Sequence, residues 1–131
     1  MGLQNGRERM RQRDLERQAV AAAKKRLDRL DLYPSPVRTR GVRILSVPWV
    51  FGLPGMRRFY GYEFGPLILI RMPLAEASDD LITHELCHVW QWQQRPLRMP
   101  LTMLTTRYER NPYELEARRA VAETRADLPQ K

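Results

Sequence analysis

The sequence predicts an α+β fold, in which a small antiparallel sheet packs beside a central helix and a C-terminal helix that carries glutamates. Helical periodicity covers both ends of the 131-residue chain, at residues 7–31 and 76–127. Between them, residues 42–72 are rich in β-branched and aromatic side chains and are interrupted by Gly and Pro, which is typical of short strands. A chain of this length buries a single core.

The N-terminal part is predicted to be a basic amphipathic helix over residues 7–31, followed by a linker. Its thin apolar stripe has helical spacing and consists of Leu15, Ala19, Ala23, Leu27 and Leu30. Two prolines and a terminal glycine predict a linker over residues 32–41. We therefore expect residues 1–41 to form a helix with a Pro-rich linker, and residues 42–131 to form the main domain.

The charge of the N-terminal helix raises the question of an anionic partner. The net charge is +8, and nine Lys or Arg stand against five acids in residues 1–31. Such a helix could bind nucleic-acid phosphates or an anionic membrane surface. However, the acids are interleaved with the bases and no aromatic residue is present for base stacking. A solvated face is therefore favoured, with nucleic acid or an anionic surface as the alternative.

The remaining elements follow from local composition. Strands are expected near residues 42–47, 58–63 and 66–71, the last being the apolar run Pro-Leu-Ile-Leu-Ile-Arg. Helices are expected over residues 76–127, with a short middle helix near residues 97–109.

Compartment is inferred from cysteine usage and hydropathy. A single cysteine allows no internal disulfide, which is typical of a reducing compartment. No run of about 18 apolar residues predicts a transmembrane helix, and the N-terminus lacks an apolar signal-peptide core. We expect a cytoplasmic protein.

Both histidines of the chain belong to one motif, His-Glu-Leu-Cys-His at residues 84–88. On a helix, His84 and His88 lie on one face about a turn apart, so both imidazoles can reach one Zn²⁺ at about 2.0–2.1 Å. Glu85 is about 100° around the helix. It can stay off the metal and take a proton from a metal-bound water as general base.

The ends of the motif helix are also encoded locally. Ser78 is the expected N-cap, with Asp79 and Asp80 in the first turn, and Pro96 is expected to end the helix. Ile82, Leu86 and Val89 form one apolar stripe that can be buried. Cys87 lies near its edge and is expected to be a small packing residue rather than a ligand.

A third zinc ligand must be a carboxylate, because no histidine remains. Asn111 is predicted to cap a helix that has Pro112 at its first position. At about 100° per residue, Glu114 lies roughly 60° from the centre of its apolar face and Glu116 roughly 100° away on the other side. Glu114 is the better ligand candidate, with a capping box as its alternative role. Glu116 is expected to be a solvated partner of Arg119.

Two segments, His-Glu-Leu-Cys-His-Val-Trp-Gln (84–91) and Asn-Pro-Tyr-Glu-Leu-Glu-Ala (111–117), resemble the gluzincins, zinc metallopeptidases with two His and one Glu as ligands. The resemblance covers about residues 58–125 and implies a zincin-like fold with Glu114 as the third ligand. One position departs from the family pattern: Arg118 stands where many gluzincins carry an Asp or Asn that holds a zinc histidine. Either Asp80 or a backbone carbonyl would then orient the histidines, or the site is weakened.

The resemblance implies a peptidase with zinc as cofactor and a peptide or protein as substrate. In that family the strand before the motif helix is an edge strand to which substrate adds, here residues 66–71, although its apolar run fits a buried strand equally well. Tyr108 or Tyr113 is a candidate for stabilising the oxyanion.

The alternative function is a non-catalytic basic adaptor, or a partner-binding or nucleic-acid-binding protein, that retains the fold with a structural zinc. Arg118 and the small size of the chain favour this alternative.

Overall fold

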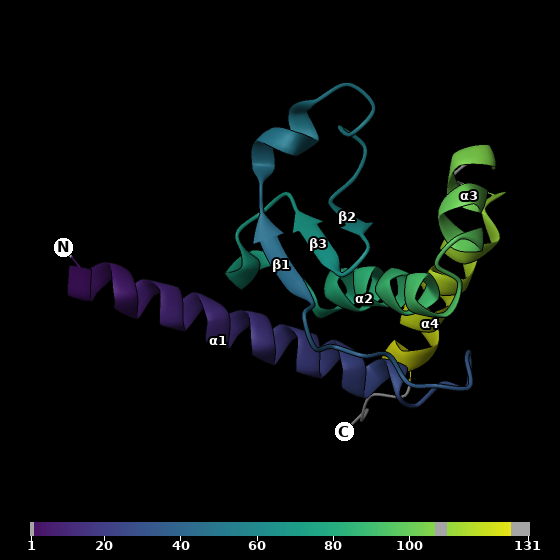
Figure 1. The fold of residues 1–131 in the computed structure, drawn as a ribbon, viewed down its shortest axis with the longest axis horizontal. Coiled ribbons are helices and arrows are strands. Elements are labelled where there is room, and N and C mark those ends of the chain that lie inside the picture. Colours follow the sequence, from purple (N-terminus) through teal and green to yellow (C-terminus); the bar gives the residue numbers. More distant parts are fainter. Residues whose placement is uncertain (1, 107–109, 127–131) are drawn as a thin grey trace.

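The computed structural model describes residues 2–106 and 110–126 and confirms an α+β fold (Figure 1). Within these residues there are four α-helices and one three-stranded sheet. The elements, in chain order, are α1 (Gly2–Leu27), β1 (Arg43–Ser46), the 3₁₀ turn η1 (Pro48–Gly52), β2 (Gly61–Phe64), β3 (Leu67–Ile70), the 3₁₀ turn η2 (Leu74–Glu76), α2 (Asp79–Gln94), α3 (Arg98–Thr105) and α4 (Pro112–Ala126).

The sheet is mixed, so the prediction of an antiparallel sheet is wrong for one of its two strand pairs. Its strand order is β1-β3-β2, with β2 antiparallel and β1 parallel to β3. Gly65, with a φ of 62°, lies in the two-residue turn that joins β2 to β3 as neighbours. The parallel pair is β1 and β3. Parallel neighbours need a crossover connection, and the long segment through η1, between β1 and β2, is part of that connection.

The position of β3 also corrects the expected edge strand. Leu67–Ile70 is the central strand, hydrogen-bonded on both sides, and Ile68 and Ile70 are fully buried. A peptide therefore cannot add to residues 66–71. The edge strand beside the motif helix is β2, whose Gly61 lies against side chains of α2.

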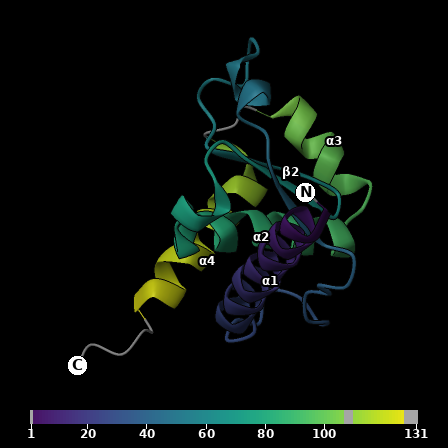
Figure 2. The same cartoon turned by 90° about the vertical axis from the view of Figure 1, so that its left-hand side faces the viewer.

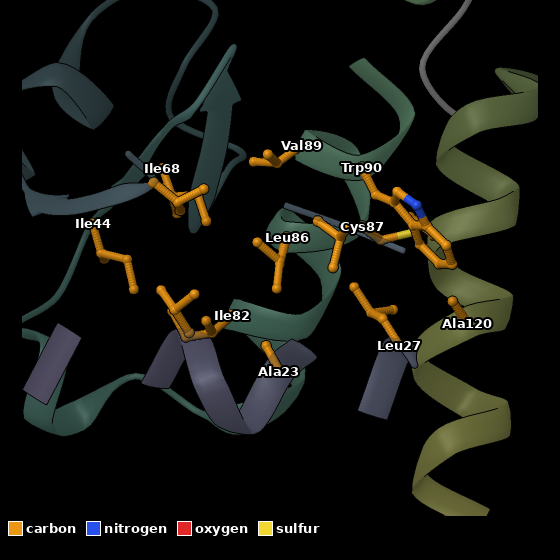
Figure 3. Packing of buried hydrophobic residues seen from close by; sticks show 14 of the residues in the cluster. Ala23, Leu27, Ile44, Ile68, Ile82, Leu86, Cys87, Val89, Trp90 and Ala120 are labelled. Atoms are coloured by element: carbon orange, nitrogen blue, oxygen red, sulfur yellow. The ribbon is translucent and has the colours of Figure 1, made fainter. Parts of the chain in front are cut away.

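Helix α2 is the centre of the hydrophobic core, with α1 and α4 packed against it (Figures 1 and 2). Figure 3 shows Leu86 in the middle of this core, with Ile44 and Ile68 on the sheet side and Ala120 on the α4 side. The second half of α1 contributes Val20, Ala23 and Leu27 to the same core. Cys87 is fully buried, as expected of a packing residue, and its burial raises the pKa of the thiol.

The predicted ends of two helices are confirmed by their capping contacts. Ser78 Oγ accepts a hydrogen bond from the backbone N–H of Leu81 at 3.1 Å, and α2 ends at Gln94, two residues before Pro96. At the start of α4, Asn111 Oδ1 accepts from the backbone N–H groups of Tyr113 (2.9 Å) and Glu114 (3.3 Å). Both caps are local contacts, which is why sequence alone located them.

The segment expected as a linker packs against α2. The Tyr33 ring meets the Trp90 ring edge-on at 5.4 Å between centroids, and Trp90 Nε1 donates to the carbonyl of Ser35 at 2.8 Å. The first half of α1, by contrast, extends away from the other elements, and its residues from Arg7 to Asp14 are exposed (Figure 1). No helix among the described residues has the length and apolar character needed to cross a membrane.

Candidate metal centre

The packing of α4 on α2 brings the three predicted ligands together. His84 Nε2 lies 3.1 Å and His88 Nε2 3.0 Å from Oε1 of Glu114. The Glu114 side chain is 1% exposed, that of His88 5% and that of His84 17%. His84 therefore lies at the solvent side of the group.

The spacing of these donors fits a metal ion. The three ligand atoms lie within 4.8 Å of one another. In a tetrahedral zinc site with bonds of about 2.0–2.1 Å, donors lie roughly 3.3–3.4 Å apart, which is close to the 3.1 and 3.0 Å between Glu114 Oε1 and the two imidazole nitrogens. This buried His-His-Glu group could hold a metal ion.

The electrostatics of the group without metal are those of an ion pair. Burial raises the pKa of Glu114, but its hydrogen bonds with His84 and His88 outweigh burial and lower the pKa below its usual range. Burial lowers the pKa of His88, but the Glu114 hydrogen bond and the charges of Glu85 and Glu114 outweigh it and raise the pKa to about 9. A metal must displace the His88 proton, so metal affinity should rise with pH up to about 9.

Gln91, one turn along α2, orients His88. Its Nε2 donates to the carbonyl of Tyr113 (2.8 Å) and to Oε1 of Glu116 (3.0 Å). The amide oxygen therefore faces His88 and accepts from Nδ1 at 2.7 Å. This bond places the proton of neutral His88 on Nδ1 and leaves Nε2 for the metal.

Glu116 supports the site from behind, and the expectation that it pairs with Arg119 in solvent is wrong. Besides Gln91, Glu116 Oε1 accepts from the hydroxyl of Tyr33 at 2.6 Å. Burial is the largest cause that raises the pKa of Tyr33, followed by its bond to Glu116. The linker, α2 and α4 are thus joined directly behind His88.

Arg118 and Asp80 have roles that the sequence did not predict. Arg118 Nε donates to Oε2 of Glu114 at 2.8 Å, so it holds the carboxylate with Oε1 toward the histidines. Asp80 pairs with Arg26 (2.9 Å) and Arg125 (2.5 Å). It joins α1, α2 and α4, and the expectation that it orients the histidines is wrong.

Glu85 lies off the ligand group, as its helical position predicts, and packs against β2. It is 5% exposed. A Cβ atom on Gly61 would lie 3.2 Å from both Cγ and Oε2 of Glu85, so a larger residue there would require the Glu85 side chain to shift. Burial is the largest cause that raises the pKa of Glu85. Sequence reasoning missed Gly61, although a glycine inside a strand is a recognised mark of close approach.

Two hollows meet at Glu85. One, of about 290 Å³, lies between β2, α2 and α3, and the other, of about 640 Å³, lies on the α4 side and includes Arg58, Arg118 and Arg125. They share Phe59, Gly61 and Glu85.

Of the two tyrosines suggested as oxyanion donors, the structure describes only Tyr113. Tyr108 lies outside the described residues, and Tyr113 lines neither hollow. Tyr60 lines the larger hollow and Tyr62 the smaller one.

No protein-family model, no curated protein and no solved structure matches this chain.

We expect Glu114→Gln to lower metal affinity by at least about 100-fold, because a neutral amide replaces a ligand carboxylate. Glu116→Gln is the matched control, and should lower it by no more than about 10–100-fold, the usual effect of an outer partner. Competition with a chromophoric chelator, with Zn²⁺ and Co²⁺ as probes, measures both. Equal affinity in the wild type and Glu114→Gln would place the third ligand elsewhere.

Proposed function

We propose that this protein is a zinc-dependent peptidase with a gluzincin-type site. The observation that carries the proposal is the buried group of His84, His88 and Glu114, with Glu85 beside it at the junction of two hollows. Two imidazole nitrogens and one carboxylate oxygen are the ligands of many catalytic zinc sites, which keep a fourth position for water or substrate. Structural zinc sites are usually closed by four protein ligands, and three donors gather here among the described residues.

Zinc bound at this site would polarise the scissile carbonyl and lower the pKa of a bound water to near neutrality. Glu85 would take a proton from that water and later give it to the leaving amine. Its burial supports this assignment, because burial raises the pKa of the carboxyl group and so makes it a stronger proton acceptor. Gln91 and Arg118 would hold His88 and Glu114 in place during the reaction.

The substrate would lie along β2. This strand is hydrogen-bonded to β3 on one side only, and its first residue, Gly61, lies against Glu85. An extended peptide that added to the free edge would be held through its main chain, with little sequence preference from those bonds. Side chains on either side of the cleaved bond would then face the two hollows that meet at Glu85.

The proposal is tested by metal analysis and by hydrolysis of a mixed peptide library followed by mass spectrometry. We expect about one zinc per purified chain, cleavage that a chelator abolishes, and recovery on addition of Zn²⁺. Cleavage that survives complete removal of the metal would contradict a zinc mechanism. Stoichiometric zinc without cleavage of any library peptide would favour the basic adaptor. In that case, the exposed first half of α1 would be the surface to test for partner binding.

A further inference from the structure

The smaller hollow combines apolar walls with one carboxyl group that the proposed chemistry does not use. Trp92 of α2 and Met99 and Met103 of α3 line it. Met99 is 3% exposed, and Trp92 packs on the β2–β3 turn, where a Cβ on Gly65 would be 3.5 Å from its ring. The volume of about 290 Å³ is at the lower end of small-molecule pockets, so the hollow suits one amino-acid side chain.

Glu63 provides that carboxyl group. On β2 it alternates with Tyr62 and shares the sheet face of Gly61, which is the face turned toward α2. It accepts a hydrogen bond from the backbone N–H of Gly65, and no ion pair among the described residues includes it. Burial is the largest cause that raises its pKa, to about 8. Glu63 is partly buried, and a carboxylate in such a place is stabilised by a cation beside it, as the charge of His88 in the same hollow already does in part.

We propose that this hollow receives a lysine or arginine side chain of the substrate next to the cleaved bond, and that Glu63 is the specificity-determining residue. The inference rests on the proposed peptidase function. Lysine and arginine have a long apolar stem and a cationic end. The stem would lie between Trp92 and the methionines, where an indole face also attracts a cation. The cationic end would meet the Glu63 carboxylate.

The competing possibility is a hollow for an uncharged apolar side chain, with Glu63 remaining protonated. Lysine and norleucine distinguish the two, because norleucine has the same stem without the ammonium group. We would compare kcat/KM for peptide pairs that differ only by this exchange beside the cleaved bond. The wild type should favour lysine by at least about thirty-fold, the usual effect of one partner in a buried charge pair.

Variants assign the preference to Glu63. Glu63→Gln should bring the lysine-to-norleucine ratio close to one, and Glu63→Lys should favour a glutamate peptide over the lysine peptide. Glu123→Gln, which removes an exposed carboxylate on α4, is the matched control and should keep the wild-type ratio. Thermal unfolding of each variant checks that it is folded. If Glu63→Lys does not fold, the near-isosteric Glu63→Gln is sufficient to test the role of Glu63.

A binding measurement separates this inference from the proposed function. Calorimetry with zinc-loaded Glu85→Gln protein, with and without Glu63→Gln, gives the affinities for the lysine and norleucine peptides without turnover. Cleavage with no preference for a basic residue, or tighter binding of norleucine, would overturn the inference and leave the peptidase in place. Lysine-selective binding through Glu63 without cleavage by the wild type would reject the peptidase but keep the cation site. Absence of binding and of cleavage would reject both.

Discussion

Glu85→Gln should reduce kcat/KM for a library peptide that the wild type cleaves by about 10²–10⁴, the usual contribution of a positioned acid–base group. The amide has nearly the size of the carboxyl group and should fit the same buried space against Gly61. Because Glu85 is outside the group of His84, His88 and Glu114, the variant should keep its zinc. Kinetics, zinc content and thermal unfolding, measured on the same sample, check all three statements.

The control for this variant is Glu123→Gln, which makes the same chemical change at an exposed position of α4 and should leave kcat/KM unaltered. If zinc-loaded wild type and Glu85→Gln hydrolyse the same peptides at equal rates, Glu85 is not the general base. Equal behaviour of the two proteins in a broad library and in cells would make the basic adaptor the better account.

His88→Ala should abolish stoichiometric zinc binding and lower the melting temperature. The imidazole is buried and connects Gln91 of α2 with Glu114 of α4. The chain has one other histidine, His84, which is itself one of the three candidate ligands, so no histidine is left to replace His88. Its loss leaves the buried amide oxygen of Gln91 without its partner, while Glu114 keeps His84 and Arg118. In the wild type, a metal present at 100 times its dissociation constant adds about 2.7 kcal/mol to the free energy of unfolding.

The response to a chelator distinguishes metal loss from simple destabilisation. Chelation should lower the melting temperature of the wild type and of Cys87→Ala, the control that removes a buried side chain next to His88 without removing a ligand. It should not change that of His88→Ala. Zinc that is retained at one ion per chain in His88→Ala would remove this residue from the metal site.

Contacts between residues close in the chain explain what was correctly predicted. The caps at Ser78 and Asn111 join residues two or three apart, so the starts of α2 and α4 could be read from composition. The helical repeat alone places His84 and His88 on one face and Glu85 off it. The same repeat placed Cys87 near the edge of the apolar stripe as a small packing residue, and the residue is fully buried.

Contacts between distant segments explain the errors and omissions. Strand order depends on where the chain between β1 and β2 runs, and composition does not encode that path. The sequence therefore left open whether residues 66–71 form an edge strand or a buried strand, and β3 is central. The partners of Asp80 are Arg26 and Arg125, which lie on other helices. The sequence did not predict a role for Glu63, which is one of fifteen acidic residues. Its position in a hollow arises only when β2 and α3 come together in the fold.

By itself, the sequence determined the helix that carries the two histidines, the glutamate beside them, and the caps that begin α2 and α4. These properties depend on backbone periodicity and on hydrogen bonds within one turn. The sequence favoured Glu114 over Glu116 as the ligand, but only the tertiary structure decided that Glu114 meets the histidines and that Glu116 turns to Tyr33 and Gln91. That choice depends on how α4 rotates as its Ala117 and Ala120 pack against the core, a property of the assembled core and not of any segment.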